Sequence, residues 1–305
     1  MNYQEYLISK PCLLETFHYQ GNSYIEKYVN YRTIEDYIDI DVTIYNMYLF
    51  CTCFDFLDVN AETCILPQTG YSKRFRLYLH TSDKIQYRGD TGVNAYEVMK
   101  QLVYADTGEF WGNDAIKADK AEFLAKLFSV CEKYGLTEEL NQHIRLCYGI
   151  GNFYPIPYTF IKGIRTSLNQ IKGNLIDNSS GKGFVDVMQE FLLCMYKFFM
   201  GEEVSQGKEI INNLNDNYMN YIKLFGSGEQ GWENFIDWNY FQEFVDENYQ
   251  PILFWKVDKD NPVEGIKTYL KEINKALSYR ENRLAEKLNT VHVPDYVEKM
   301  FENAP

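Results

Sequence analysis

The sequence predicts a mainly α-helical protein that forms a single multi-helix globular unit, with a minor β element in the N-terminal third. Two patterns carry this prediction. From about residue 114 onward apolar residues recur at the spacing of amphipathic helices, whereas residues 75–80 alternate between apolar and polar as a short strand does. A third observation favours one continuous unit, because no long linker, low-complexity tract or internal repeat is present.

The N-terminal third is the least regular part of the chain. Residues 24–56 mix helical signals with β-branched ones, so the strand at residues 75–80 is the only distinct β signal there. Any subdivision of the unit would separate a mixed N-terminal part, residues 1–112, from a helical part, residues 113–305.

The first helices of the helical part carry signals at their ends. Apolar residues from Phe123 to Cys131 share one face, and Gly135 is placed to end that helix. Thr137 can cap the next helix. Its apolar positions are Leu140, Ile144 and Cys147.

Four more helices follow in the sequence pattern. The clearest covers residues 184–199, and others are predicted over residues 210–225 and 232–245. The last long helix begins with Asn261 as its cap and Pro262 at the first helical position. Its apolar stripe consists of Val263, Ile266, Tyr269, Leu270, Ile273, Leu277, Leu284 and Leu288.

Composition and charge limit the classes of partner. The 305 residues include 43 acidic and 30 basic ones, for a net charge of −13, which disfavours general binding to nucleic acids. The 26 tyrosines and 20 phenylalanines could form a stacking surface, but they lie mostly at positions that suit a helical core. We therefore expect an unidentified small ligand or a protein as partner, and the sequence does not predict the oligomeric state.

The sequence predicts a cytoplasmic protein without a membrane segment. Its seven cysteines are an odd number and are expected to be reduced thiols. The first residues lack the pattern of a signal peptide. The most apolar runs, residues 47–54 and 191–200, are far shorter than the roughly 18 residues that a membrane span needs.

Two glycine-rich segments resemble the sequence motifs of nucleotide-binding loops but do not meet the requirements of such loops. Residues 226–231 match G-x-G-x-x-G, but the segment before them has a helical period, where a dinucleotide site requires a strand. In residues 179–183, Gly183 stands where a phosphate loop needs Ser or Thr. Both segments are therefore interpreted as turns or helix connections, and no cofactor is expected.

No metal site or catalytic residue is predicted. Cys51, Cys53, Cys64 and His80 could be assembled into a zinc set, but their spacing is poor for one, and packed thiols are the simpler interpretation. The four histidines form no H-x-x-x-H pair, and no serine lies in a G-x-S-x-G elbow. We therefore expect no stoichiometric zinc or iron, and the catalytic residues of any enzyme activity stay unknown.

One basic segment departs from the acidic average. Residues 71–88 contain five basic residues against one acidic residue, Asp83. Such a segment could bind an anionic ligand, or its charges could protect an edge strand from pairing with other chains. The sequence leaves both alternatives open.

A set of short segments spread over about two thirds of the chain carries a family resemblance. They are residues 82–85, 89–91, 150–157, 167–169 and 224–227, Trp232, residues 241–245, Trp255 and residues 279–284. Together they resemble an uncharacterised bacterial domain-of-unknown-function family. The resemblance implies a bacterial source and a shared fold, but no activity.

A second resemblance covers a shorter stretch. Gly151-Asn-Phe153, residues 168–174 and Lys182 resemble the tail of some His-Me-finger nuclease domains. The acidic-residue–His–Ile metal motif expected upstream is absent, since His143 lies too near and His80 is followed by Thr. Such a nuclease needs a divalent ion and a histidine that activates water.

The function that the sequence favours is a binding or interaction module of unassigned function. The alternative is a divalent-metal-dependent nuclease or phosphodiesterase with a degenerate His-Me-finger-like segment. Asn152 is expected to be a structural bridge to the turn at residues 167–169, because irregular backbone before a Pro-x-Pro run needs hydrogen-bond partners. The candidate ligand-binding cluster consists of Asp90, Asn94, Asn152, Ser167, Asn169 and Lys172.

Overall fold

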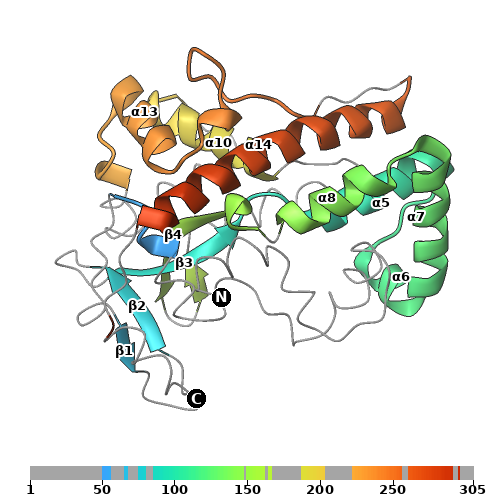
Figure 1. The fold of residues 1–305 in the computed structure, drawn as a ribbon, viewed down its shortest axis with the longest axis horizontal. Helices are drawn as coiled ribbons and strands as arrows, with labels where there is room; N and C mark the ends of the chain where they lie inside the picture. Colours follow the sequence, from blue (N-terminus) through green and yellow to red (C-terminus); the bar gives the residue numbers. More distant parts are fainter. Residues whose placement is uncertain are drawn as a thin grey trace.

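One long helix crosses the molecule, and the other helices and a small sheet are arranged around it (Figure 1). The predicted mainly α-helical fold with a minor β element is confirmed. None of the helices in the part of the chain that is described is long and apolar enough to cross a membrane. The computed structural model describes residues 50–55, 65–67, 75–79, 85–147, 149–161, 164–166, 187–202, 222–255, 260–290 and 295.

The long helix is α14, Pro262–Thr290, and it begins where the sequence predicts. The side-chain oxygen of Asn261 accepts a hydrogen bond from the Glu264 amide at 3.4 Å, and the Asn261 carbonyl accepts one from Gly265. Pro262 costs nothing here because its missing N–H would have no partner in the first turn. All eight residues of the predicted apolar stripe are buried, so hydrophobic burial along one face stabilises the helix.

Four helices lie on the side of the N-terminal half of α14 (Figure 1): α5 (Ala95–Thr107), α6 (Asn113–Ala118), α7 (Lys120–Tyr134) and α8 (Thr137–Cys147). Of these, α5 and α8 pack against α14, and α7 packs against α5 and α8. Gly135 ends α7 in the left-handed conformation, with φ of 65°, as predicted. Helix α5 lies before the predicted start of the helical pattern. Lys100 and Gln101 are buried there beside apolar residues, so no polar face marks this helix in the sequence.

Helices α10 (Val187–Phe199) and α13 (Gly228–Trp238) pack together near the C-terminal half of α14. The prediction of a helix over residues 232–245 is wrong at its C-terminal end. Asn239 terminates α13, because its side chain and its amide both donate to the Phe235 carbonyl. Tyr240 then takes a left-handed conformation, with φ of 59°, and a short 3₁₀ helix, η3, covers Gln242–Phe244.

The sheet has five antiparallel strands in the order β1-β2-β3-β4-β5. They are β1 (Ile65–Pro67), β2 (Phe75–Leu79), β3 (Ile85–Thr91), β4 (Phe153–Ile161) and β5 (Ile164–Thr166). Strand β2 confirms the predicted strand. Strands β4 and β5 follow α8, so the sheet also draws on the middle of the chain, where Pro155 and Pro157 exclude a helix and face Gly89 and Tyr87 of β3.

The buried guanidinium of Arg280 joins three of these elements. It lies on α14 and is 1% exposed. Its Nε and Nη2 donate to the Asn239 carbonyl at 3.2 and 3.0 Å. Its Nη1 donates to the carbonyls of Gly151 and Phe153 at 2.6 and 2.5 Å, at the 3₁₀ turn η2 (Ile150–Asn152). Arg280 therefore holds the end of α13 and the start of β4 against α14.

Asn152 fastens the same turn to the loop before α5. Its carboxamide is buried, accepts from the Val93 amide at 2.7 Å, and donates to the carbonyls of Val93 and Cys147 at 3.0 and 2.8 Å. The expected structural bridge is present, but its partners are Val93 and Cys147. The turn at residues 167–169, the partner expected from the sequence, lies outside the described residues.

We expect Asn152→Ala to lower the free energy of unfolding by about 1–3 kcal/mol, because truncation leaves buried backbone groups of Val93 and Cys147 without partners. Chemical denaturation of the wild type and the variant measures the loss. Asn234→Ala is the control, since the half-buried Asn234 side chain makes a single bond to backbone, at Phe225. Equal losses in the two variants would contradict the bridging role.

Candidate functional site

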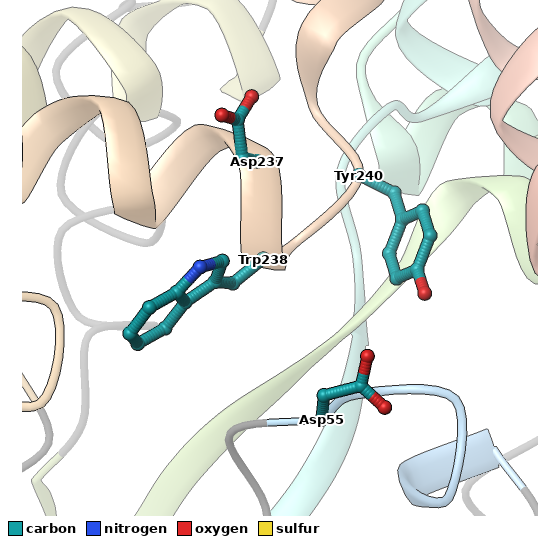
Figure 2. Close-up of a pocket in the computed structure, with 4 residues that line it drawn as sticks. All are labelled: Asp55, Asp237, Trp238 and Tyr240. Carbon is teal, nitrogen blue, oxygen red and sulfur yellow. The ribbon is translucent and has the colours of Figure 1, made fainter.

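A pocket of about 390 Å³ opens beside the C-terminal end of α13. Among the described residues it is lined by Asp55, Asp237, Trp238 and Tyr240. Figure 2 shows the indole of Trp238 and the ring of Tyr240 on opposite sides of the hollow, with the Asp55 carboxylate pointing up from below. We call this site the Trp238 pocket.

The two aromatic walls come from the turn that ends α13. Trp238 is the last residue of the helix and is 40% exposed, with its ring near Phe225 at a centroid distance of 5.8 Å. Tyr240 is held more firmly, because its hydroxyl donates to the Cys53 carbonyl at 3.0 Å and its ring packs edge-on to Phe54. Burial raises the pKa of Tyr240, so this hydroxyl stays a donor at neutral pH.

The two carboxylates of the pocket point in different directions. The Asp55 side chain is 80% exposed and accepts a hydrogen bond from the Lys287 ammonium at 2.7 Å. The Asp237 carboxylate points away from Asp55 (Figure 2) and accepts from Gln242 Nε2 at 3.1 Å and from the Tyr249 hydroxyl at 3.2 Å. They therefore do not form the facing pair that an acid–base mechanism on a single substrate bond uses.

A second polar cluster lies in the core, at the contact of α8 with α14. His143 Nδ1 is 2.7 Å from Asn274 Oδ1, and His143 Nε2 is 3.6 Å from the Cys147 sulfur. Asn274 Nδ2 donates to the Glu139 carbonyl at 3.0 Å, so its oxygen faces the histidine. Nδ1 must then carry the proton, and Nε2 accepts from the thiol.

The residues of this cluster resemble a Cys-His-Asn catalytic set, but their surroundings oppose catalysis. All three side chains are buried, and burial lowers the pKa of His143 to about 4 despite its bond to Asn274. Cys147 is the last residue of α8, where the helix dipole disfavours a thiolate. The cluster is a closed network of neutral groups that joins two helices.

Sequence analysis missed both sites for different reasons. The four-residue spacing of His143 and Cys147 was a visible signal, because residues four apart share a helix face. Asn274 is distant in sequence, and nothing in the pattern links it to them. Trp238 and Tyr240 were assigned to one helix, which hid the turn between them.

The structure places three of the six predicted ligand-binding residues. Asn94 caps α5, where its side chain accepts from the Tyr96 amide at 3.0 Å, and the buried Asn152 binds Val93 in the same loop. Asp90 lies in β3 opposite Tyr154. Ser167, Asn169 and Lys172 lie outside the described residues, so the ligand role of the cluster stays a prediction.

Most of the predicted alternatives for metal and anion binding fall on undescribed side chains. Cys51 and Cys53 are buried and are not in disulfides, and burial raises the pKa of the Cys53 thiol to about 12. Cys64 and His80 lie outside the described residues. Within the described parts of the chain, no three His, Cys, Asp or Glu side chains form a group that could hold a metal ion. The basic side chains of residues 71–88 are likewise not described.

Comparisons with protein-family models, with curated proteins and with solved structures gave no match. The bacterial family and the nuclease tail therefore rest on the sequence segments alone. The function has to be argued from the geometry of the Trp238 pocket and of the His143 cluster.

The network around His143 predicts acid sensitivity. The free pKa of histidine is about 6.5, so between pH 6.5 and 4 the unfolded chain binds a proton that the folded chain excludes. The stabilisation from the neutral histidine is complete above pH 6.5 and falls by up to about 3 kcal/mol as the pH drops to 4.

Denaturation of the wild type and of His143→Asn across this pH range measures the effect. We expect the variant to lose that part of the pH dependence. Burial raises the pKa of Glu281, which works in the opposite direction, but this contribution is common to both proteins. Parallel pH profiles for the two proteins would show that His143 titrates alike in both states.

Proposed function

We propose that this chain is a non-catalytic binding protein that takes a small organic ligand in the Trp238 pocket. The observation that carries the proposal is an open pocket of about 390 Å³ with an exposed tryptophan on its wall and an exposed carboxylate beside it. Ligand pockets have about this volume and combine apolar walls with a few polar groups.

The setting of the two aromatic rings supports this proposal. Most large aromatic side chains of the described core are buried, whereas Trp238 keeps 40% of its surface exposed. Tyr240 has φ of 59°, a conformation that costs free energy for a residue other than glycine. Such strain is retained mainly where the surrounding structure or a function requires it. The Trp238 pocket is a different site from the polar cluster around Asn152, which is the ligand-binding site that the sequence favours.

The alternative is a divalent-metal-dependent nuclease or phosphodiesterase, which the resemblance of residues 151–153 and 168–182 suggests. That chemistry requires a histidine with access to water and metal. His143, the histidine nearest to residue 151 in sequence, is buried and uses both ring nitrogens within the cluster. We therefore prefer the binding protein.

We also infer a cytoplasmic location. The five described cysteines, Cys51, Cys53, Cys131, Cys147 and Cys194, are all buried, and none of them is in a disulfide. Reduced, packed thiols are typical of proteins in a reducing compartment. The acidic charge of the chain continues to disfavour generic nucleic acid as a partner.

Saturation-transfer NMR with a library of neutral, anionic and cationic fragments tests the proposed pocket. We expect the wild type to bind a subset of fragments that Trp238→Ser no longer binds. Tyr279→Ser is the matched control, because Tyr279 is 50% exposed on α14 and is not among the described residues that line the pocket. Both variants should fold, since surface substitutions usually change stability by no more than about 0.5 kcal/mol.

Two results would contradict the proposal. The first is that no fragment binds the wild type. The second is that every fragment bound by the wild type is bound equally by Trp238→Ser, which would place the binding site elsewhere.

A further inference from the structure

We propose that the ligand of the Trp238 pocket is an organic cation whose alkylated ammonium group lies between Trp238 and Tyr240, above the Asp55 carboxylate. This inference rests on the proposed function and adds the chemical class of the ligand. Three properties of the described residues support it: the charge that remains after pairing, the two aromatic faces, and the helix end that borders the pocket.

Among the described carboxylates around the pocket, one has no cationic partner among the described residues. Asp55 pairs with Lys287 at 2.7 Å, and Glu243 pairs with Arg283 at 3.2 Å. Asp237 accepts only from neutral donors among the described residues, namely Gln242 and Tyr249. A cation entering the pocket therefore meets a carboxylate that no described cation neutralises. The guanidinium of Arg280 is buried behind the turn, where backbone carbonyls accept its hydrogen bonds. The net charge of −13 adds a long-range attraction.

The aromatic walls suit an alkylated ammonium better than a compact, strongly hydrated ion. Trp238 and Tyr240 lie on opposite sides of the hollow in Figure 2 and both line the pocket, so a ligand that fills the pocket borders both rings. The faces of aromatic rings attract cations, and tryptophan does so most strongly. The methyl groups of an alkylated ammonium can also displace water from the apolar walls of the pocket, which a hydrated metal ion would not do.

The end of α13 adds a third contribution of the same sign. Asp237 and Trp238 form the last turn of this eleven-residue helix. The carbonyl groups at a helix C-terminus carry a partial negative charge, which stabilises nearby cations. Arg280 already uses this property at the Asn239 carbonyl, on the buried side of the turn.

The ammonium group of Lys287 occupies the position beside Asp55 where the positive charge of the ligand is expected to lie. Its ammonium donates to Asp55, and this bond raises the pKa of Lys287. The lysine side chain is 30% exposed and flexible, so it can leave the carboxylate when a ligand cation takes its place. Lys287 thus competes with the ligand for Asp55, and its removal should strengthen binding.

Choline and its uncharged isostere, 3,3-dimethylbutan-1-ol, separate charge from shape. We expect NMR titrations of the full chain at constant ionic strength to give choline a dissociation constant about tenfold lower than that of the isostere. Equal binding of the two compounds, or no binding of choline, would overturn the inference. If fragments bind in a Trp238-dependent way in either case, the proposed function stands and only the ligand class fails.

Three variants place the cation in the pocket. Trp238→Leu and Asp55→Asn should each weaken choline binding by about tenfold, whereas Lys287→Gln should strengthen it several-fold. Asp114→Asn is the matched control for Asp55→Asn, because Asp114 is also exposed and paired with a lysine, Lys117, at 3.6 Å.

The variants also give results that would overturn the inference. If Trp238→Leu and Asp55→Asn bind choline as the wild type does, choline lies elsewhere on the chain. Weaker binding in Lys287→Gln would mean that the lysine contacts the ligand and does not compete with it. Circular dichroism confirms folding, and Asp55→Asn keeps the test decisive if Trp238→Leu does not fold.

Discussion

The structure depends on one buried guanidinium. Arg280 faces no carboxylate among its described hydrogen-bond partners; instead it donates to backbone carbonyls of Asn239, Ile150, Gly151 and Phe153. Removing this charge from water is costly, and the burial lowers the pKa of Arg280 to about 9. The carbonyl dipoles, which include the C-terminal end of α13, offset that cost. The face of Phe241, 4.7 Å from the guanidinium, contributes in the same way.

The same face of α14 then continues to the Trp238 pocket. Arg283, one turn after Arg280, donates to the Tyr240 carbonyl and to the Gln242 side chain. The Leu284 carbonyl is 3.9 Å from the Cys53 sulfur, and Lys287 binds Asp55. Residues three and four apart share a face, so one helix face positions the turn after α13 and the segment at residues 50–55. The walls of the pocket are thereby fixed relative to each other before any ligand arrives, which favours binding.

The parts of the fold that local chemistry determines were predictable. The cap at Asn261, the left-handed Gly135 and the strand β2 follow from residues a few positions apart, and the structure has them where the sequence places them. The sheet is different, because the first six residues of β4 pair with β3, more than sixty residues earlier. Its two prolines showed that a helix was excluded, but they did not show which partner would supply the hydrogen bonds.

The candidate site was hidden for the same reason. The turn that presents Trp238 and Tyr240 exists because Asn239 ends the helix and Arg280 takes its carbonyl, a contact across some forty residues. In the sequence, the aromatic residues on both sides of Asn239 continue a helical period, and Arg280 is a charged residue between Tyr279 and Glu281 that suggests a solvated face. Sequence analysis therefore assigned Trp238 and Tyr240 to one helix and left Arg280 unmarked.

Arg280 thus fixes the turn after α13 and the turn before β4 at the same time. Hydrogen exchange of the wild type and of Arg280→Lys, measured by mass spectrometry, tests this role of Arg280. Lysine keeps the positive charge, but its compact ammonium group cannot donate to both turns at once as the planar guanidinium does. If Arg280 holds both turns, residues 149–154 and 235–245 of the variant exchange at least about tenfold faster together, while α7 keeps its protection. Unchanged exchange in both turns, or faster exchange in only one of them, would contradict it.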